Sequence, residues 1–461
     1  MSQTVVILGA GLAGSEAALQ IADRGISVRL VEMRPQTATP VHVGADCAEL
    51  VCSNSLKSMK PESAAGMLKY ELEALGSHLM EAARRHAVAA GGALAVDRVA
   101  FSQDVTERIE AHPLIDLVRE EARSLVSFTT QADALVVATG PLTSDALADE
   151  LALLTGANHL AFYDAAAPIV MADSLDERLL FRQSRYEDGG NGVGDYLNAP
   201  FSREEYDMFI AELIAAERVI LRDFEARDLF QACQPIEEIA RKGHDAPRFG
   251  PLKPVGLTDP RTGHRPWAAL QLRAEDVHGS CYNLVGFQTN LTFAEQKRVF
   301  RMIPGLQNVE FARLGVMHRN TFVDAPHLLD DGLRLTTPAA AALGVPVHVA
   351  GQLAGTEGYC EAIRSGLHVA LAVVAELTGQ ALPSLPSETA FGALLAYATD
   401  PATQGYQPLH VNFGIMPPLV TRVRNKRERY AAYADRGARA FEGYCRELAG
   451  RGLMKECLRH A

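Results

Sequence analysis

Two of the seven cysteines stand in segments that would suit a reactive thiol. Cys52 opens the polar run CSNSLKS directly after the apolar pair Leu50 and Val51. The small hydroxyl side chains would leave this thiol accessible, and Lys57 could favour the thiolate, which is the nucleophilic form of cysteine. Cys233 opens a second segment, CQPIEEIA, far along the chain. The separation of the two cysteines in sequence excludes the dithiol of a simple disulfide reductase.

A glycine-rich turn near the start of the chain predicts a dinucleotide site that would serve these thiols. An apolar run over 5–8 precedes GAGLAG, an alanine-rich helical stretch follows, and a second strand ends at Glu32. Gly9 would permit the tight turn, Gly11 would bring backbone N–H groups to a pyrophosphate, and Gly14 would let the helix pack on the strand. The helix N-terminus would stabilise the phosphates, and Glu32 would accept hydrogen bonds from a ribose. The cofactor contacts expected here are Gly9, Ala10, Gly11, Leu12, Ala13, Gly14, Glu32 and Arg34.

Two later segments have the same strand-to-turn pattern. An apolar strand over 135–138 closes on Thr139 and Gly140, and a strand over 345–350 leads into GQLAGTEGY and a helix that extends to about 378. The N-terminus of this helix would point at the pyrimidine edge of a flavin, where negative charge collects on reduction. An ordinary tight crossover, with glycines for packing alone, is the alternative reading. The expected contacts in the late turn are Gly351, Gln352, Gly355, Glu357 and Gly358.

Length and composition narrow the class of protein. A chain of 461 residues exceeds the usual ceiling for a single core, and a hydrophobic content of 48% supports full cores. An odd number of cysteines without regular spacing argues against a disulfide framework, so we expect a cytoplasmic protein with reduced thiols. We expect no leader peptide before the first strand and no membrane span, since no apolar stretch is long enough, and no CxxC pair or histidine-rich cluster suggests a metal. The net charge of −12 argues against generic nucleic-acid binding.

The order of the patterns predicts an α/β protein in which a Rossmann-like FAD-binding domain is interrupted by an inserted α/β domain. The FAD-binding domain would comprise residues 1–90, 133–160 and 331–461, the last part with C-terminal helices. Residues 91–132 would form connecting strands that belong with the insertion. Residues 161–330, richer in proline, glycine and aromatic residues, would form the inserted domain itself.

Taken together, these motifs resemble the bacterial family of folate- and FAD-dependent tRNA uracil-5 methyltransferases, and the resemblance covers nearly the whole chain. Generic flavoproteins lack the two cysteine segments and RFGPLKPVGL. The matching segments are 9–18 (GAGLAGSEAA), 32–35 (EMRP), 48–58 (AELVCSNSLKS), 233–240 (CQPIEEIA), 248–257 (RFGPLKPVGL), 282–289 (YNLVGFQT), 317–322 (MHRNTF) and 412–414 (NFG).

The resemblance implies a reaction that forms 5-methyluridine at position 54 in the T-loop of tRNA. The carbon donor would be 5,10-methylenetetrahydrofolate, FAD would be methylene carrier and reductant, and NADH or NADPH would be the electron source. Carbon 5 of uracil is a poor nucleophile until a thiolate adds at carbon 6, so the chemistry needs a reactive cysteine. By position in the family's motifs, Cys233 would be that nucleophile and Cys52 the acid/base partner near the flavin.

A tRNA partner requires local basic surfaces on an acidic chain. One lies in the inserted region, where Asp245 and Asp259 are the only acids among its cations, and a second is predicted as a helix over 422–429. We hypothesise that the inserted domain holds the tRNA elbow while the target base turns out into a cleft between the domains. The first cluster contains Arg241, Lys242, Arg248, Lys253, Arg261, Arg265 and Arg273, and the second contains Arg422, Arg424, Lys426, Arg427 and Arg429. The contacts chosen from them are Arg248, Lys253, Arg265, Arg424 and Lys426.

Three other interpretations remain open. The related flavoprotein that modifies the wobble uridine shares the GQ-x-x-G-T-x-G-Y pattern of 351–359, but it would be expected to be longer. A flavin oxidoreductase of small molecules would not need both Cys52 and Cys233. A non-catalytic RNA-binding protein could use FAD as a structural cofactor. Replacing Cys233 by alanine would separate this reading from the enzyme readings, because in an enzyme RNA binding should survive the change and modification should not.

Overall fold

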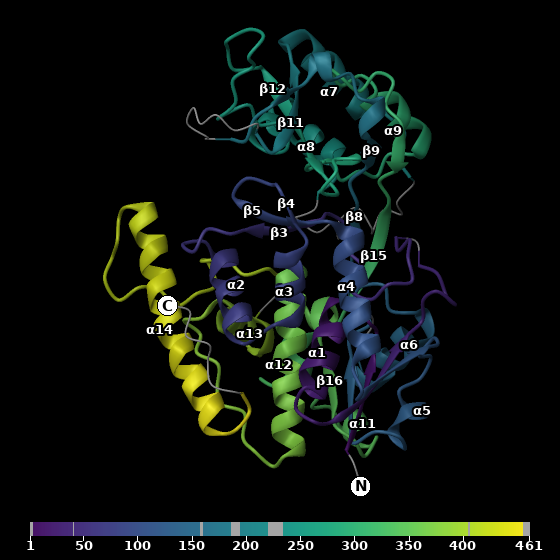
Figure 1. Ribbon diagram of the computed structural model, residues 1–461, viewed down its shortest axis with the longest axis vertical. Coiled ribbons are helices and arrows are strands. Elements are labelled where there is room, and N and C mark those ends of the chain that lie inside the picture. The colour runs from purple at the N-terminus through teal and green to yellow at the C-terminus, as the bar shows by residue number, and fades with distance from the viewer. Residues whose placement is uncertain are drawn as a thin grey trace.

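The computed structural model describes residues 3–39, 41–156, 160–185, 194–219, 234–403 and 406–454, with the backbone alone for 160–165 and 317–320. Figure 1 shows two lobes stacked along the long axis. We call the described residues before 157 and after 320 the cofactor lobe, and those over 166–316 the inserted lobe. Each lobe has a large hydrophobic core of its own. In the described part of the chain, no helix combines the length and the apolarity that crossing a bilayer demands.

A five-stranded parallel sheet forms the centre of the cofactor lobe. Four of its five strands carry runs of valine, isoleucine and leucine that are almost wholly buried, as expected of a sheet with helices on its faces, and the fifth, an edge strand, is partly exposed. Because the strands are parallel, their carboxyl ends share one edge, and the three glycine-rich turns follow the strands that end there. The order is β16 (Val347–Val349), β7 (Ala134–Val137), β1 (Thr4–Leu8), β2 (Ser27–Glu32) and β6 (Ile115–Arg119).

Two helices, α1 (Leu12–Ala22) and α12 (Tyr359–Leu377), pack against each other with unusually close backbones. A Cβ atom on Gly366 would lie 2.1 Å from the carbonyl oxygen of Ala13, and one on Gly14 would lie 1.8 Å from that of Gly9. Only glycine fits at either position, so the contact fixes the two helices relative to each other and to β1.

The other helices and strands of the cofactor lobe surround this centre. A small antiparallel sheet has the order β3 (Ser55–Ser58), β5 (Ala93–Val96) and β4 (Ala87–Val88). The helices are α2 (Ala64–Ala74), α3 (His78–Arg85), α4 (Arg98–Ala111), α5 (Val126–Thr129), α6 (Asp145–Thr155), α10 (Ala325–Leu328), α11 (Pro338–Ala341), α13 (Ala390–Thr399) and α14 (Lys426–Gly450). The long α14 runs along one side of the lobe in Figure 1.

The assignment of residues 91–132 to the insertion differs from the structure. β6 is the edge strand of the parallel sheet and pairs with β2, from Val28 opposite Ile115 to Glu32 opposite Arg119. Helix α4 packs on α1 and α3. Gly91 and Gly92 mark a turn inside the small sheet and not a domain boundary, so this segment is part of the cofactor lobe.

The inserted lobe is built on a six-stranded antiparallel sheet with three helices, α7 (Arg203–Ala215), α8 (Ile236–Lys242) and α9 (Phe293–Phe300). A two-stranded ribbon of β8 (Leu160–Ala165) and β15 (Met317–Phe322) carries the chain into the lobe and back. The sheet order is β10 (Phe181–Arg182), β11 (Tyr196–Phe201), β12 (Ala268–Ala274), β13 (Cys281–Leu284), β9 (Ile169–Met171) and β14 (Phe311–Arg313).

Candidate active site

The first glycine turn presents backbone N–H groups at the end of β1. Gly9 has a φ of +97°, which side-chain-bearing residues rarely adopt, and its N–H donates to the carbonyl oxygen of Val31 at 2.7 Å. Gly11 is the N-cap of α1, and no side chain among the described residues caps that end. The unpaired amides and the partial positive charge of the helix are therefore available to an anion.

The three turns enclose a pocket with a volume of about 370 Å³. Its wall contains every predicted cofactor contact except Ala10, Gly14 and Gly355. Gly14 serves helix packing, and Gly355, with a φ of +80°, lies beneath the hydroxyl of Tyr406, which a Cβ atom would approach to 1.7 Å. The pocket therefore combines Gly9, Gly11, Leu12, Ala13, Glu32, Arg34, Thr139, Gly140, Gly351, Gln352, Glu357 and Gly358.

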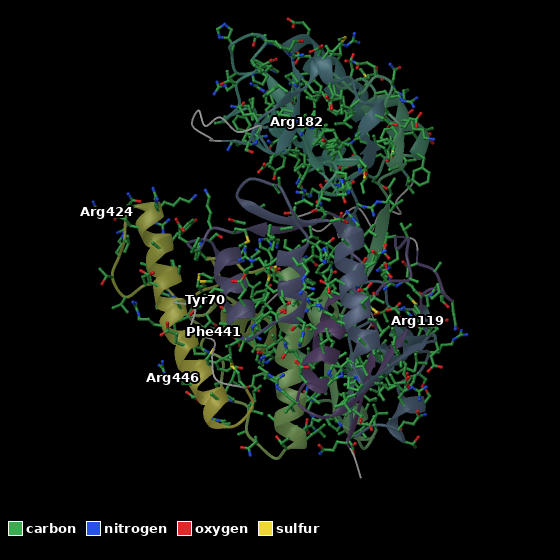
Figure 2. All side chains as sticks on the ribbon, viewed as in Figure 1. Tyr70, Arg119, Arg182, Arg424, Phe441 and Arg446 are labelled. Carbon is green, nitrogen blue, oxygen red and sulfur yellow. The ribbon has the colours of Figure 1, made fainter. Side chains whose placement is uncertain are left out.

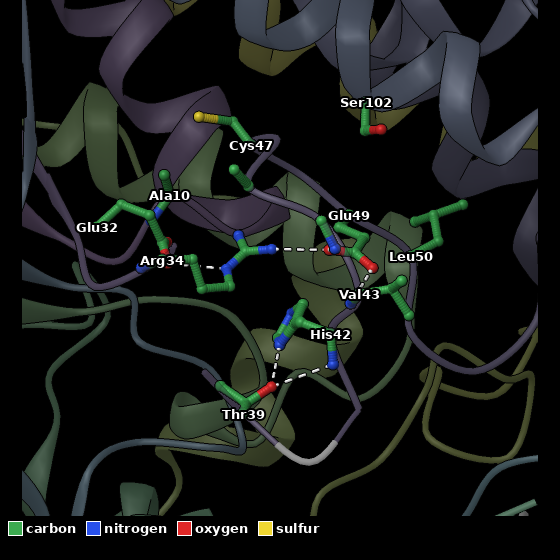
Figure 3. A network of polar contacts seen from close by, with 12 residues as sticks. Ala10, Glu32, Arg34, Thr39, His42, Val43, Cys47, Glu49, Leu50 and Ser102 are labelled. Carbon is green, nitrogen blue, oxygen red and sulfur yellow. Dashed lines mark hydrogen bonds and ion pairs between the residues drawn. The ribbon is translucent and has the colours of Figure 1, made fainter. Parts of the chain in front are cut away.

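Glu32 is the centre of a buried polar network (Figure 3). Its Oε2 accepts the N–H of Ala10 at 2.8 Å, and its Oε1 accepts Nε of Arg34 at 2.9 Å. Burial would raise the pKa of Glu32, but the charge and hydrogen bonds of Arg34 and the Ala10 N–H outweigh it and lower the pKa. Arg34 also donates from Nη1 to Glu49 Oε2 at 2.9 Å. Glu49, which sequence reasoning missed, completes a chain of carboxylate, guanidinium and carboxylate groups at this end of the pocket.

The late turn brings a second helix N-terminus to the same pocket. Gly351 has a φ of +75° and donates its N–H to Ser365 Oγ at 2.9 Å, and Gly358, with a φ of +111°, is the N-cap of α12. No side chain in the described part of the chain caps this helix. The side chain of Gln352 donates to Glu357 across the turn. The pocket thus has an uncapped helix N-terminus at each of two glycine turns.

Cys52 lines this pocket, and the hydroxyl of Tyr359 holds its loop. The hydroxyl oxygen accepts the N–H of Cys52 at 2.9 Å and the N–H of Ser53 at 3.2 Å. Tyr359 is the first residue of α12, so the loop is tied to the helix that begins at the late glycine turn. Burial, and then the nearby Cys52, raise the pKa of Tyr359, so this phenol stays neutral.

Two arginines of the inserted lobe donate hydrogen bonds to the same loop. Arg273 donates from Nε to Asn54 Oδ1 at 2.7 Å and from Nη2 to Ser53 Oγ at 2.9 Å, while Arg313 donates from Nη2 to the carbonyl oxygen of Cys52 at 3.0 Å. We expected Arg273 in a basic surface for tRNA, but it is 5% exposed and serves this contact. The Cys52 loop, residues 52–54, therefore lies where the two lobes meet.

Lys57 and Glu361 form a charged pair in the wall of the pocket. Lys57 has a φ of +67°, an uncommon backbone conformation that tends to be retained at functional sites. Its Nζ lies 3.3 Å from Oε1 of Glu361, whose side chain is buried. Oε2 of Glu361 has no hydrogen-bond partner among the described residues. Sequence reasoning placed Lys57 beside Cys52 and missed Glu361.

Cys233 lies outside the described residues. The residues that follow it are anchored beside the pocket: Ile236 donates its N–H to the carbonyl oxygen of Gln288 at 2.7 Å, and Gln288 lines the pocket. Glu237 is fully buried and accepts Thr289 Oγ1 at 3.0 Å and the N–H of Asn290 at 2.6 Å. Of the cysteines expected to be inert, Cys47, Cys360 and Cys445 are buried, Cys281 is half-buried, and Cys457 is outside the described residues.

The five predicted tRNA contacts occupy different environments. Arg248 donates to the carbonyl oxygen of Trp267 at 3.0 Å, and its guanidinium lies 3.7 Å from the centre of the indole ring. Lys253 is half-buried and Arg265 is exposed, both in the inserted lobe. Arg424 and Lys426 are exposed at the start of α14, and Arg424 precedes the helix that we expected to contain it.

Comparisons with known proteins assign the family. The family model described as "Glucose inhibited division protein A" matches residues 4–381. Methylenetetrahydrofolate--tRNA-(uracil-5-)-methyltransferase TrmFO of Geobacter sulfurreducens is 52% identical over 438 residues, which are 95% of this chain and 97% of that protein. The chain belongs to this methyltransferase family. The protein of the same name from Heliobacterium modesticaldum is 50% identical over 96% of this chain and 98% of its own.

Solved structures support the fold of this family member. GidA of Aquifex aeolicus superposes with a TM-score of 0.67 at 16% identity, covering 99% of this chain and 74% of its own. This likeness shows a Rossmann-type α/β flavoprotein fold. The predicted fold class and the predicted family are thus confirmed.

Proposed function

We propose that the protein methylates carbon 5 of uridine 54 in the T-loop of tRNA, with 5,10-methylenetetrahydrofolate as carbon donor, FAD as cofactor, and NADH or NADPH as electron source. The observation that carries the proposal is the placement of the Cys52 loop in the wall of a pocket with two uncapped helix N-termini. Such a pocket fits a flavin dinucleotide with a thiol beside it. The names of the relatives supply the substrate class.

The residues of the pocket fit the two ends of FAD. Gly11 and the first turn of α1 would face the pyrophosphate, and Glu32, held ionised by Arg34, would face the adenosine ribose. Gly351 and Gly358 leave room for the ring system before α12, whose N-terminus would favour negative charge at the pyrimidine edge. Bound flavin would supply the carbon carrier and the hydride.

The thiols would act on the uracil ring. The Cys233 thiolate would add to carbon 6, which makes carbon 5 nucleophilic, and Cys52 would remove the proton from carbon 5 after the carbon–carbon bond forms, which frees the new carbon from its carrier. Delivery of hydride to that carbon would then restore the carbon 5–carbon 6 double bond and expel the Cys233 thiolate. Tyr359 and Arg273 keep the Cys52 loop in place for that proton transfer. Ile236, three positions after Cys233 in the sequence, donates its N–H to the carbonyl oxygen of Gln288 in the pocket wall. Reduced thiols suit the cytoplasm, where we place the enzyme.

The test is incubation of purified protein with unmodified tRNA, methylenetetrahydrofolate and NADH or NADPH, followed by mapping of 5-methyluridine by mass spectrometry. Methylation at position 54 that is lost in Cys52→Ala and Cys233→Ala, with FAD still bound, is the expected result. Modification of the wobble base would favour the related anticodon enzyme. A Cys233→Ala variant that methylates as fast as the wild type would refute the proposed chemistry.

A further inference from the structure

The start of α14 and the loop before it carry a concentration of positive charge. We define the α14 basic surface as Arg422, Arg424, Lys426, Arg427 and Arg429, of which Arg429 is half-buried and the other four are exposed. Glu428 is the single acid within 422–429, although the chain as a whole has a net charge of −12. None of these five cations forms an ion pair with another described residue. Their charge is therefore available to a partner from solution.

The cations of the inserted lobe are largely engaged within the protein. Arg261 is paired with Asp259 at 2.7 Å, and Arg248 lies on the Trp267 ring with Asp245 at 3.4 Å. Phosphate contacts by these side chains would require existing interactions to be exchanged for new ones. The two clusters that look equivalent in the sequence thus differ in how much charge they offer.

Aromatic stacking positions part of the α14 basic surface in advance. The rings of Phe413 and Tyr430 are stacked with centres 4.3 Å apart. Lys426 Nζ lies 5.4 Å and the Arg429 guanidinium 5.7 Å from the centre of the Tyr430 ring. These distances are typical of cation–π contacts, which hold the charged groups without neutralising them. Less conformational entropy is then lost when they bind an anion.

The helix that carries the surface is fixed to the cofactor lobe. Gly437 packs against Met67 so closely that a Cβ atom would lie 2.5 Å from the methionine methyl group. Further along, Phe441 is buried with its ring 6.2 Å from that of Tyr70 (Figure 2). The helix that carries Lys426, Arg427 and Arg429 is therefore packed against α2.

A short stretch of chain connects this surface to the pocket. Val411 donates its N–H to Oε1 of Glu361 at 3.2 Å, and Glu361 lines the pocket. Phe413 follows two residues later, and an extended chain advances at most about 3.6 Å per residue, so the Cα atom of Phe413 lies within roughly 7 Å of that of Val411. A polymer bound on the surface would pass close to the pocket.

We propose that the α14 basic surface binds the ribose-phosphate backbone of the tRNA and is the main electrostatic contact that presents the substrate to the pocket. The inference rests on the proposed function for the identity of the RNA. It changes the hypothesis drawn from sequence, because the cofactor lobe and not the inserted lobe would supply most of the phosphate contacts.

The test compares two double charge reversals on one helix and its leading loop. Arg422→Glu with Arg424→Glu alters the surface, and Arg439→Glu with Arg446→Glu makes the same change of charge on exposed residues farther along α14; Figure 2 labels Arg424 and Arg446. We expect the first variant to bind unmodified tRNA at least tenfold more weakly, and the control less than threefold more weakly. The slope of log K against log salt should fall by about 2 for the first variant, since each duplex phosphate contact contributes about 0.9.

FAD content and the urea midpoint should match the wild type in both variants, which separates lost contacts from misfolding. Equal weakening in both variants would show a general effect of net charge and overturn the inference, as would unchanged binding in the first variant with methylation intact. Wild-type protein that binds anionic phospholipid vesicles but not tRNA would overturn the inference in favour of a membrane contact. Wild-type protein that binds tRNA through this surface without methylating it would leave the inference standing and refute the proposed function.

Discussion

Glu237 provides a quantitative test of the architecture around the segment that follows Cys233. Burial raises the pKa of this carboxyl from its ordinary value of 4.5 to about 7, because the hydrogen bonds from Asn290 and Thr289 only partly replace water. Each pKa unit corresponds to about 1.4 kcal/mol, so the ionised side chain costs the folded state about 3 kcal/mol. The favourable contribution of the protonated form is complete below pH 4.5 and is lost as the pH rises to about 7.

Glu237→Gln should remove this dependence on pH. Glutamine can accept from the Asn290 N–H and donate to Thr289 Oγ1, as the protonated acid does. We therefore expect the variant to be about as stable as the wild type near pH 5 and more stable by about 2–3 kcal/mol at pH 8. Urea unfolding followed by the fluorescence of Trp267, the single tryptophan of the chain, reports on the inserted lobe.

Glu238→Gln is the matched control, because it makes the same change one residue along the chain. The side chain of Glu238 is 25% exposed and is paired with Arg218. Surface ion pairs contribute about 0–1 kcal/mol, so its stability should change little. A stability difference between Glu237→Gln and the wild type that is the same at pH 5 and pH 8 would refute the reasoning. So would a variant that is less stable at pH 8.

Three further substitutions test the pocket. Glu32→Gln should weaken FAD binding at least tenfold, because the buried Arg34 loses a charge-assisted partner worth about 1.5–3 kcal/mol. Flavin fluorescence on dilution measures the affinity, and an unchanged affinity would contradict the role of the network. Tyr359→Phe should retain FAD but lower the methylation rate at least tenfold, because the N–H groups of Cys52 and Ser53 lose their acceptor. Turnover at the wild-type rate would show that the hydroxyl does not position the loop. Gly14→Val should yield colourless protein, since its Cβ atom would lie 1.8 Å from a carbonyl oxygen; a full flavin spectrum would refute the packing argument.

The sequence predicted the parts of the site that are local in the chain. The three glycine turns follow strands within a few residues, and the spacing to Glu32 follows from the length of one strand–helix–strand unit. These features depend on backbone conformation and sheet geometry, which neighbouring residues determine. Twelve of the cofactor contacts in the pocket wall could therefore be named without the structure.

The contacts of the site that the sequence did not predict join segments that are distant in the chain. The Tyr359 hydroxyl meets the Cys52 N–H across 307 positions, and Arg273 reaches Ser53 across 220. No periodicity or motif encodes such pairs. For the same reason, the sequence did not show that Arg273 is buried at the contact between the lobes. It also did not show that β6 is an edge strand of the sheet, because the mixed sequence IDLVR is identified as one only by its pairing with β2.

The contact of Gly366 with the Ala13 carbonyl has a consequence for cofactor selectivity. Because backbone packing sets the distance between the two uncapped helix ends, a bound molecule must be long enough to bridge a gap that the protein does not adjust. A mononucleotide such as FMN would reach one end only and leave the other to water. Preference for the longer flavin would then follow from how two helices touch, independently of any contact with adenine.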